Sequence, residues 1–309
     1  MEAGAVGATS SSSAAAAARP RDARSLAADL LTLTKPKVQS LLLFTTVTTM
    51  LVAGDPSLGS IALTCLGGAL SAGGAGAINH YLDRDIDAVM RRTSDRPIPS
   101  GRVPARWALV YGVALGAASF VLLAATVNVL AASLALAGLL GYVGVYTLWL
   151  KRRTAQNIVI GGAAGAMPPL VAWAATTGSV GADALYLFAV VFFWTPPHFW
   201  SLSLLMKGEY ERAGVPMLPA VRGEAETRVQ ILLYTVVLTA WTALPLLVPA
   251  LRFGVAYLVA AIVLGGAFIA LAERLRRRAD RPWALRTYLF SLLYLALLFS
   301  AAVVDAKLL

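Results

Sequence analysis

Long uncharged stretches dominate the hydrophobic and polar pattern of this chain. Cutting the sequence at its charged residues leaves these main windows: 38–54, 56–82, 107–150, 154–182, 184–206, 229–251, 253–272 and 287–304. A bilayer core of about 30 Å is spanned by roughly 20 helical residues, so most windows are long enough for one crossing. The window 107–150 must hold two, with a hinge near 126–128. The pattern predicts an all-α, polytopic membrane protein with nine transmembrane helices.

Charge is scarce and unevenly placed. Only 14% of the residues are charged, and the net charge is +10. In a nine-helix topology, all Lys and Arg residues except Arg252 and Lys307 fall on one side, which the positive-inside rule makes cytoplasmic. We therefore expect a multi-pass protein of the cell membrane with a cytoplasmic N-terminus, contacting membrane lipid and not nucleic acid. Residues 1–35 are typical of a disordered cytoplasmic tail, and 36–309 form the membrane domain.

The stretch NHYLDRDIDAVMRRTSDRPIPSG (79–101) places acidic and basic side chains directly after an apolar window. Asn79, Asp83 and Asp87 recur every four residues, so a helix that continues past the bilayer carries all three on one face. An amide oxygen and two carboxylates are hard ligands that suit Mg²⁺, with substrate phosphate oxygens completing the shell. Asp85 points away from this column, and we expect it to pair with an arginine at the surface.

Four arginines follow these carboxylates: Arg91, Arg92, Arg96 and Arg102. Guanidinium groups bind phosphate oxygens in a bidentate manner, so metal ligands followed by arginines around a proline-rich turn predict a diphosphate-binding site. Basic residues are also expected in such a loop for topology alone, and either explanation fits each arginine. The carboxylates are more informative, because acidic side chains at a bilayer boundary are costly.

Three motifs resemble a known family. They are the stretch 79–101, the segment YTLWLKRRTAQNIVIGGAAGAMPPLVAW (146–173) and the segment WTPPHFWSLSLLMKGEYERAGVPMLP (194–219). Together they are similar to the protohaem IX farnesyltransferases, which are the haem branch of the UbiA-type intramembrane prenyltransferases. The resemblance extends over roughly residues 30–305. It implies nine helices around a central cavity that opens to the cytosolic side.

The resemblance also implies a reaction. Members of the haem branch transfer the farnesyl group of farnesyl diphosphate to the 2-vinyl group of haem b and add water, which gives haem O for terminal oxidases. Mg²⁺ would be the cofactor, held by Asn79, Asp83 and Asp87, whereas haem b is a substrate. Asp83 and Asp87 would be catalytic through this metal, because it draws charge onto the leaving diphosphate. A downstream haem A synthase is a candidate partner.

The second motif contributes Tyr146 and Lys151. Their spacing is similar to that of a Tyr and Lys pair which the superfamily uses beside the diphosphate. The resemblance therefore assigns Tyr146 to substrate binding and Lys151 to catalysis. An aromatic residue of the membrane interface followed by a positive-inside cluster explains the same pattern equally well, so both interpretations stay open.

The third motif contains His198 and Trp200 within an apolar window. Pro196 and Pro197 are expected to interrupt the helix there and to free backbone carbonyls. An imidazole among aromatic side chains suits a haem contact. The resemblance favours a catalytic role for His198 at the haem or in the addition of water, with Trp200 packing on the porphyrin. The alternative is a histidine that is hydrogen-bonded within the helix bundle.

Two departures separate this chain from the broad superfamily. His80 stands where many members have an Asp, and Met206 and Tyr210 occupy the positions of a second Asp pair. These departures argue against a second, carboxylate-bound Mg²⁺. We expect Lys207 to neutralise part of the substrate charge, and Glu209 to be a ligand or a lysine partner.

Two other functions fit parts of the sequence. A prenyltransferase that acts on an aromatic acid or quinone precursor would use the same first motif, although the third motif favours the haem branch. A transporter or proton relay could also use acidic residues at a membrane boundary. Transport sites usually lie near the bilayer midplane, whereas the charges here cluster in loops on the cytosolic side.

Overall fold

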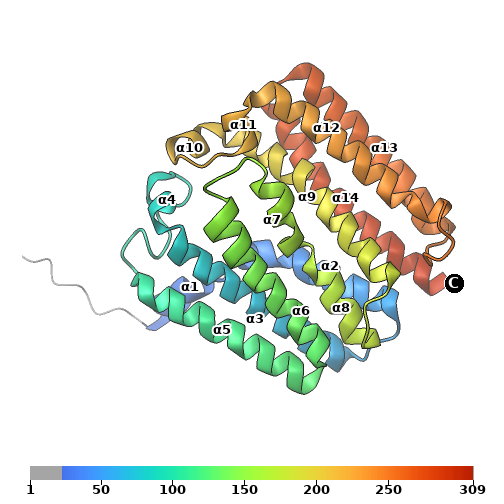
Figure 1. Ribbon diagram of the computed structural model, residues 1–309, viewed down its shortest axis with the longest axis horizontal. Helices are drawn as coiled ribbons and strands as arrows, with labels where there is room; N and C mark the ends of the chain where they lie inside the picture. The colour runs from blue at the N-terminus through green and yellow to red at the C-terminus, as the bar shows by residue number, and fades with distance from the viewer. Residues whose placement is uncertain (1–22, 309) are drawn as a thin grey trace, which may run out of the picture.

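The computed structural model describes residues 23–308, and every regular element in this range is helical (Figure 1). The elements are α1 (Ala23–Leu33), α2 (Pro36–Ala53), α3 (Leu58–Leu82), α4 (Arg84–Val89), α5 (Ala105–Thr126), α6 (Val129–Leu140), the π-helix η1 (Gly141–Leu150), α7 (Asn157–Gly165), α8 (Met167–Thr177), α9 (Ala182–Leu205), α10 (Lys207–Arg212), α11 (Leu218–Val221), α12 (Gly223–Thr242), the 3₁₀-helix η2 (Leu244–Leu246), α13 (Val255–Arg278) and α14 (Arg281–Leu308). Long helices form the body of the molecule, and the short helices α4, α10 and α11 gather at one end.

Nine helical segments of the described chain are long and apolar enough to cross a membrane, which confirms the predicted number. Three of these segments combine two elements: α6 with η1, α7 with α8, and α12 with η2. The window 107–150 is divided as predicted, between α5 and α6. At the division, Asn128 Oδ1 accepts a hydrogen bond from the Ala131 amide at 2.8 Å. This asparagine cap satisfies a free N–H group at the start of α6.

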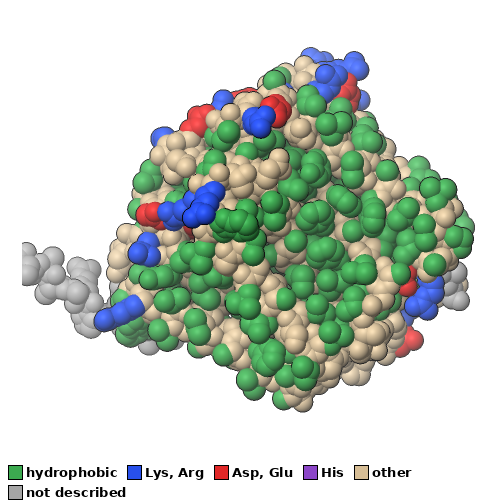
Figure 2. Space-filling model, viewed as in Figure 1, with side chains coloured by type: hydrophobic (Ala, Val, Ile, Leu, Met, Phe, Trp, Pro, Cys, Tyr) green, Lys and Arg blue, Asp and Glu red, His purple; other side chains and the backbone are tan. Residues whose placement is uncertain are grey.

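The outer surface is apolar along the long helices. Figure 2 shows hydrophobic side chains over most of the viewed face, with Lys, Arg, Asp and Glu gathered near its margins. Val110 and Val121 of α5 and Val263 of α13 are among the exposed large side chains. Such an apolar surface would be a liability in water, but lipid tails are as apolar as these side chains.

Helix α1 corrects the expected extent of the disordered tail. The prediction covers residues 1–35, but Ala23–Leu33 is helical, with Leu33 fully buried. Leu26 and Leu30 pack against the same apolar cluster, which also includes Ala77 of α3. Because these leucines recur at helical spacing, the segment can bury one face against the bundle. Residues 1–22 of the predicted tail lie outside the described residues.

Glycines let α3 and α5 pack closely, side by side in Figure 1. A Cβ atom at Gly74 would lie 2.6 Å from the Gly112 carbonyl oxygen, so a larger residue would push the two helices apart. Small residues commonly permit such close approach between membrane helices. The packing fixes α3, whose last turn carries Asn79.

Helix α9 corrects the expected interruption at Pro196 and Pro197, because it runs unbroken from Ala182 to Leu205. Each proline removes one backbone hydrogen bond from the helix. Neighbouring helices and serine side chains can compensate for such losses in a membrane protein. Here α9 packs against both α12 and α14. Packing therefore keeps the helix continuous.

Candidate active site

Three predicted ligands share a buried face where α3 meets α4. The backbone keeps its helical spacing across the junction: the Asp83 amide donates to the Asn79 carbonyl at 2.9 Å, and the Asp87 amide donates to the Asp83 carbonyl at 2.7 Å. All three side chains are buried. Asn79 Nδ2 also donates to Asp83 Oδ2 at 2.7 Å. The helical column of Asn79, Asp83 and Asp87 therefore forms with the spacing that the sequence indicates.

Basic side chains from other parts of the chain neutralise the two carboxylates of the column. Lys151, directly after η1, donates to Asp83 Oδ2. Arg96 Nη1 contacts both oxygens of Asp87, at 2.8 and 2.7 Å. A buried carboxylate needs such partners because an unpaired buried charge is costly. Asp83 Oδ1 stays buried without a hydrogen bond to any described residue.

Lys35 is a site residue that none of the three motifs contains. Its Nζ donates to Asn79 Oδ1 at 2.5 Å. Its backbone is left-handed, with a φ of 55°, directly before Pro36 at the start of α2. Residues with side chains rarely adopt this conformation unless their surroundings impose it. Burial, reinforced by repulsion from Arg96 and Lys151, lowers the pKa of Lys35 to about 7. The Lys-Pro pair at the start of an apolar helix was its only sequence signal.

Asp85 lies outside the column, as its helical position predicts. Arg152 donates two hydrogen bonds to it, each of 2.7 Å, and this contact lowers the pKa of Asp85 to about 2. The Asp85 side chain is 60% exposed. Exposed ion pairs contribute little to stability, so Asp85 is a surface charge.

Arg102 is a member of the predicted arginine set whose contacts lie away from the column. Its Nε donates to Asp29 of α1 at 2.9 Å, and its Nη2 donates to the Asp95 carbonyl at 2.8 Å. The turn between Arg96 and Arg102 reverses the chain, with a φ of 72° at Gly101. Arg96 consequently faces the column, whereas Arg102 faces α1. The sequence could not predict this division because it depends on the geometry of the turn.

Four other predicted residues lie near the rim of the site. Arg91 and Arg92 are exposed in the loop after α4. The Arg92 amide donates to Glu209 of α10 at 3.5 Å, which links the first and third motifs. Lys207 pairs with Glu224 of α12 at 3.4 Å. Glu209 therefore lies beside the loop that follows the column, whereas Lys207 lies against α12.

The π-helix η1 brings the second motif against the first. The Lys151 amide donates to the Tyr146 carbonyl at 2.8 Å, which is a spacing of five residues. π-turns occur frequently at functional sites. Tyr146 is buried, and its ring centroid lies 5.3 Å from that of Tyr142. Thr147 Oγ1 accepts a hydrogen bond from Asn79 Nδ2 at 3.2 Å. Thr147 and Lys151 therefore face the column, and Tyr146 is buried next to Tyr142.

The third motif makes its contacts within the bundle. His198 Nδ1 is hydrogen-bonded to the Ser291 hydroxyl of α14 at 2.7 Å. The imidazole stacks on Trp194 and on Tyr288, with centroid distances of 4.2 and 5.0 Å. Trp200 is almost fully buried. For His198, these contacts match the alternative of a histidine that is satisfied within the helix bundle.

The histidine beside the column is a different case. His80 is 1% exposed, and neither ring nitrogen has a hydrogen bond to a described residue. Its Nδ1 lies 3.8 Å from Asp87 Oδ2. Within residues 23–308, no three His, Cys, Asp or Glu side chains are grouped closely enough to hold a metal ion by themselves. A metal at this site would therefore need ligands beyond these four kinds of side chain.

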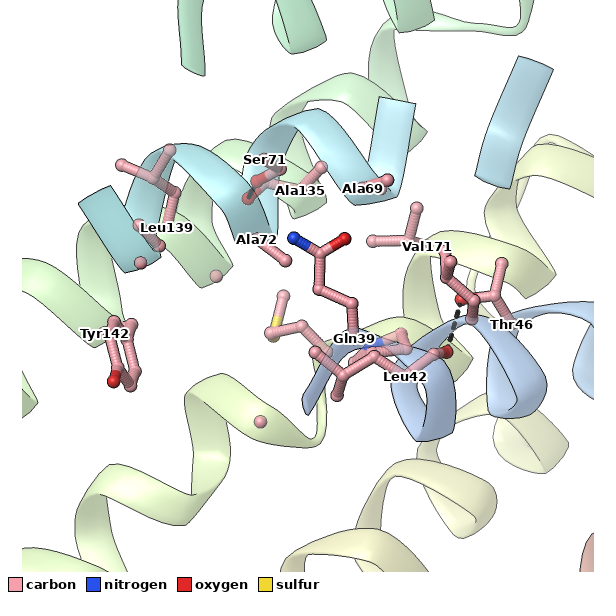
Figure 3. Close-up of a pocket in the computed structure, with 18 of the residues that line it drawn as sticks. Gln39, Leu42, Thr46, Ala69, Ser71, Ala72, Ala135, Leu139, Tyr142 and Val171 are labelled. Atoms are coloured by element: carbon pink, nitrogen blue, oxygen red, sulfur yellow. Dashed lines mark hydrogen bonds between the residues drawn. The ribbon is translucent and has the colours of Figure 1, made fainter. Parts of the chain in front are cut away.

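An apolar cavity of about 230 Å³ adjoins the cationic end of the column. Lys35 and Tyr142 line one end of it, with the Lys35 Nζ atom 6.0 Å from the centre of the Tyr142 ring. Figure 3 shows Leu42 of α2 across from Ala72 of α3, with Val171 of α8 toward the other end. The column and the cavity together suit a molecule with an anionic head and a hydrocarbon chain.

Comparison with known families agrees with this geometry. Residues 42–298 match the UbiA prenyltransferase family. The chain belongs to this family. The nine apolar helices within residues 23–308 make it a multi-pass membrane protein, as predicted.

Relatives at high identity carry one name. A "Protoheme IX farnesyltransferase" from Roseiflexus sp. (strain RS-1) is 56% identical over 284 residues, which cover 91% of this chain and 53% of the relative. The chain thus spans about half the length of that relative. A protein of the same name from Rhodopseudomonas palustris (strain BisB5) is 50% identical, with 93% of each chain covered. These relatives confirm the resemblance to the haem branch of the UbiA family.

Solved structures of UbiA-type proteins share the fold. A structure of digeranylgeranylglyceryl phosphate synthase matches with a TM-score of 0.72 at 18% identity, covering 92% of this chain and 99% of that one. A UbiA homologue from Archaeoglobus fulgidus bound to DMAPP and Mg²⁺ matches with a TM-score of 0.62 at 17% identity, covering 89% and 99%. At this identity the likeness shows the all-helical UbiA fold alone.

Proposed function

We propose that this chain transfers the farnesyl group of farnesyl diphosphate to the 2-vinyl group of haem b and adds water, which gives haem O for terminal oxidases. The observation that carries the proposal is the buried column of Asn79, Asp83 and Asp87, held among cations beside an apolar cavity. A prenyl diphosphate has the complementary form, because its head is anionic and its chain is apolar. The name shared by the relatives supports haem b as the acceptor.

The donor atoms of the column fit Mg²⁺. The column offers an amide oxygen and carboxylate oxygens, which are the hard ligands that this ion prefers. Asp83 Oδ1 is buried and lacks a hydrogen bond within the described chain, so it is available to a ligand. Diphosphate oxygens would complete the coordination, as is usual for Mg²⁺ at phosphate sites. The bound ion would supply positive charge that stabilises the leaving diphosphate.

Three basic side chains bind and orient the diphosphate in this proposal. Lys151 and Arg96 pair with the carboxylates of the column in the absence of substrate, and Lys35 donates to the Asn79 amide oxygen. When the diphosphate binds, these cations turn toward its oxygens. Fixed positive charge at this position stabilises the negative charge that develops as the C–O bond breaks. The planar guanidinium of Arg96 suits a bidentate contact with phosphate.

The new carbon–carbon bond forms at the farnesyl carbon that was bonded to the diphosphate oxygen. Diphosphate leaves with the bonding electron pair, and the vinyl carbon of haem b attacks the allylic cation. Positive charge moves to the carbon beside the porphyrin, where water adds and a proton is lost. The rings of Tyr142 and Tyr146 lie beside the column and stabilise the cation through their π faces. No protein nucleophile takes part.

The third motif and the rim residues have supporting roles in the proposal. Trp200 belongs to the same apolar cluster as Tyr146, so a porphyrin that reaches the column could pack near it. His198 would contact haem only through Nε2, because Nδ1 is bound to Ser291. Rim cations, among them Arg91, attract the diphosphate toward the site by long-range electrostatics. The remaining proposed substrate contacts at the rim are Arg92, Lys207 and Glu209.

The charged end of the bundle would face the cytoplasm of the cell. Most positive charge lies in loops on one side of the nine-helix topology, and the positive-inside rule supports a cytoplasmic position for this side and for the N-terminus. Farnesyl diphosphate would then reach the column from the cytosol. A haem A synthase that takes up haem O is the proposed downstream partner.

The test is a reaction with purified protein in detergent, supplied with haem b, farnesyl diphosphate and Mg²⁺. The expected product is a porphyrin whose mass has increased by one farnesyl group and one water. A parallel reaction replaces haem b with 4-hydroxybenzoate. Prenylation of 4-hydroxybenzoate without prenylation of haem b would overturn the assignment in favour of a quinone-precursor enzyme, and no prenylated product from either would overturn the transferase proposal.

A further inference from the structure

The apolar cavity has two different ends. On α2 the lining residues run from Val38 to Thr46, with Thr34 and Lys35 directly before the helix, and on α3 they run from Gly76 back to Thr64. The stretch on α3 corresponds to about 18 Å of helix at a rise of 1.5 Å per residue. Lys35 lies at the polar end, next to the column. Figure 3 shows Thr46 and Val171 together at the end opposite Tyr142.

The end opposite Tyr142 is closed by packed side chains. One helical turn beyond Thr46, α2 carries Thr49 and Met50, and both side chains are fully buried. Thr64 of α3 is also fully buried, and Ala174 follows Val171 on α8 with no exposed surface. A chain that entered from Lys35 could not pass these residues without displacing close-packed atoms, which is costly in a protein interior.

The walls between the two ends consist of small or flexible side chains. Ala69 and Ala72 of α3 face Gln39 and Leu42 of α2 in Figure 3. A Cβ atom added at Gly68 would meet nothing within 4 Å, so the space beside this glycine is open. Gly68 lies one helical turn from Thr64. The open volume therefore extends to the closed end and is not interrupted halfway.

We propose that Thr46, Thr64 and Val171 form a floor that limits the prenyl chain to three isoprene units. This inference rests on the proposed function, because it assumes that the diphosphate binds at the column. An extended farnesyl chain is roughly 14 Å long at C–C bonds of about 1.5 Å, so it fits a cavity of about 18 Å. A fourth isoprene unit adds about 5 Å and would meet the floor.

Two substitutions change the depth of the cavity in opposite directions. Gly68→Leu places a side chain in open space near the floor and does not collide with the backbone. It shortens the cavity, and leucine is also a better helix former than glycine. Val171→Ala removes two methyl groups from the floor and deepens the cavity. Gly266→Leu on α13 is the matched control, because a Cβ atom there also meets nothing within 4 Å and the residue is exposed on the outer surface.

The experiment offers haem b and Mg²⁺ with equimolar geranyl, farnesyl and geranylgeranyl diphosphates and measures the prenylated haems by mass. Wild type and Gly266→Leu should prefer farnesyl. Gly68→Leu should lower the ratio of farnesyl to geranyl product by about tenfold, because forcing a chain past an inserted side chain resembles overpacking a core. Val171→Ala should raise the share of geranylgeranyl product severalfold.

A second measurement reads chain length without haem. Each protein is heated with each of the three diphosphates and Mg²⁺, and the rise in Tm reports binding to the folded state. If Gly68→Leu and Val171→Ala both keep the wild-type preference among the three diphosphates, in product and in Tm, the proposed floor is wrong. The proposed function still stands in that case, provided that wild type prenylates haem b. If wild type prenylates no haem but its Tm responds to chain length as expected, the proposed function fails and the floor stands.

Discussion

The first and third motifs both combine polar side chains with an apolar helix, but the structure treats them differently. The column at the end of α3 contacts cations from three other segments and adjoins a cavity. His198 in α9 has a hydroxyl partner and two aromatic neighbours. Asp83 keeps one oxygen without a hydrogen bond, 3.9 Å from Arg152, whereas His198 Nδ1 is satisfied and Trp200 Nε1 of the same helix is not.

The difference teaches how to separate a reactive site from a packed one. A buried polar atom without a partner carries an energetic cost, which a ligand can remove. A buried histidine with a hydrogen bond and stacked rings is explained by stability alone. Two motifs that are equally specific in sequence can therefore have unequal roles, and mutations should reveal this inequality.

The largest effect is expected at the column. Asp83→Asn keeps the size of the side chain but removes the charge that would hold Mg²⁺ and pair with Lys151. We expect the rate of haem O formation to fall by about 100- to 1000-fold, as for the loss of one group that stabilises developing charge. The measurement is kcat with saturating farnesyl diphosphate, together with Tm to verify folding. Near-normal turnover in a folded variant would contradict the role of Asp83.

Two arginines of the same loop provide a matched pair. Arg96→Gln removes a guanidinium that contacts Asp87, and we expect the KM for farnesyl diphosphate to rise by about tenfold or more, which is typical for a lost charged hydrogen bond. Arg102→Gln should leave KM unchanged, because Arg102 contacts Asp29 of α1. Equal effects of the two substitutions on KM would contradict the assignment of Arg96 to the substrate site and of Arg102 to the contact with α1.

Lys35 should behave as a third cation of the site. Lys35→Met keeps the length and the apolar stem but removes the ammonium group, so we expect the KM for farnesyl diphosphate to rise by about tenfold. Lys37→Met is the control, because Lys37 is exposed in the first turn of α2. Binding of inorganic diphosphate with Mg²⁺, measured as a rise in Tm, should weaken in the first variant alone. If both variants bind it equally, Lys35 does not contact the substrate.

His198→Ala tests whether the third motif has a structural role. The substitution removes a hydrogen bond to Ser291 and two stacking contacts, and we expect a loss of about 1–3 kcal/mol in stability. The folded fraction should form haem O at a rate reduced by less than about tenfold, which is far less than the loss at Asp83. Abolished haem O formation with an unchanged Tm would instead place His198 in the chemistry.

The smallest effect is expected at Asp85. Arg152 holds the pKa of Asp85 at about 2, below its ordinary 3.8, so this ion pair is present above a pH of about 4 and is lost as the pH falls toward 2. At pH 7, Asp85→Asn should change stability by no more than about 0.5 kcal/mol because the pair is exposed. Haem O formation should be unchanged. A large loss of activity would show that the column extends to Asp85.

Much of the fold could be predicted because the information is local. Hydropathy identified the nine spans, and a four-residue spacing identified the column of Asn79, Asp83 and Asp87. The disordered tail was predicted too long, because the composition of 1–35 as a whole masked the leucine stripe that ends at Leu33. The interruption at Pro196 was wrong for a related reason: propensity describes an isolated helix, whereas packing on α12 and α14 holds α9 together.

The sequence by itself determined the membrane-spanning pattern, the spacing of the acidic residues and the family of the chain, since each is written in consecutive residues. Only the tertiary structure decided which cations meet the column, why Arg102 does not, and that Lys35 does. It also decided where the cavity ends, at Val171 among others. The physical reason is that periodicity arises within a single helix, whereas charge pairing and cavity shape arise between helices that are distant in sequence and brought together by packing.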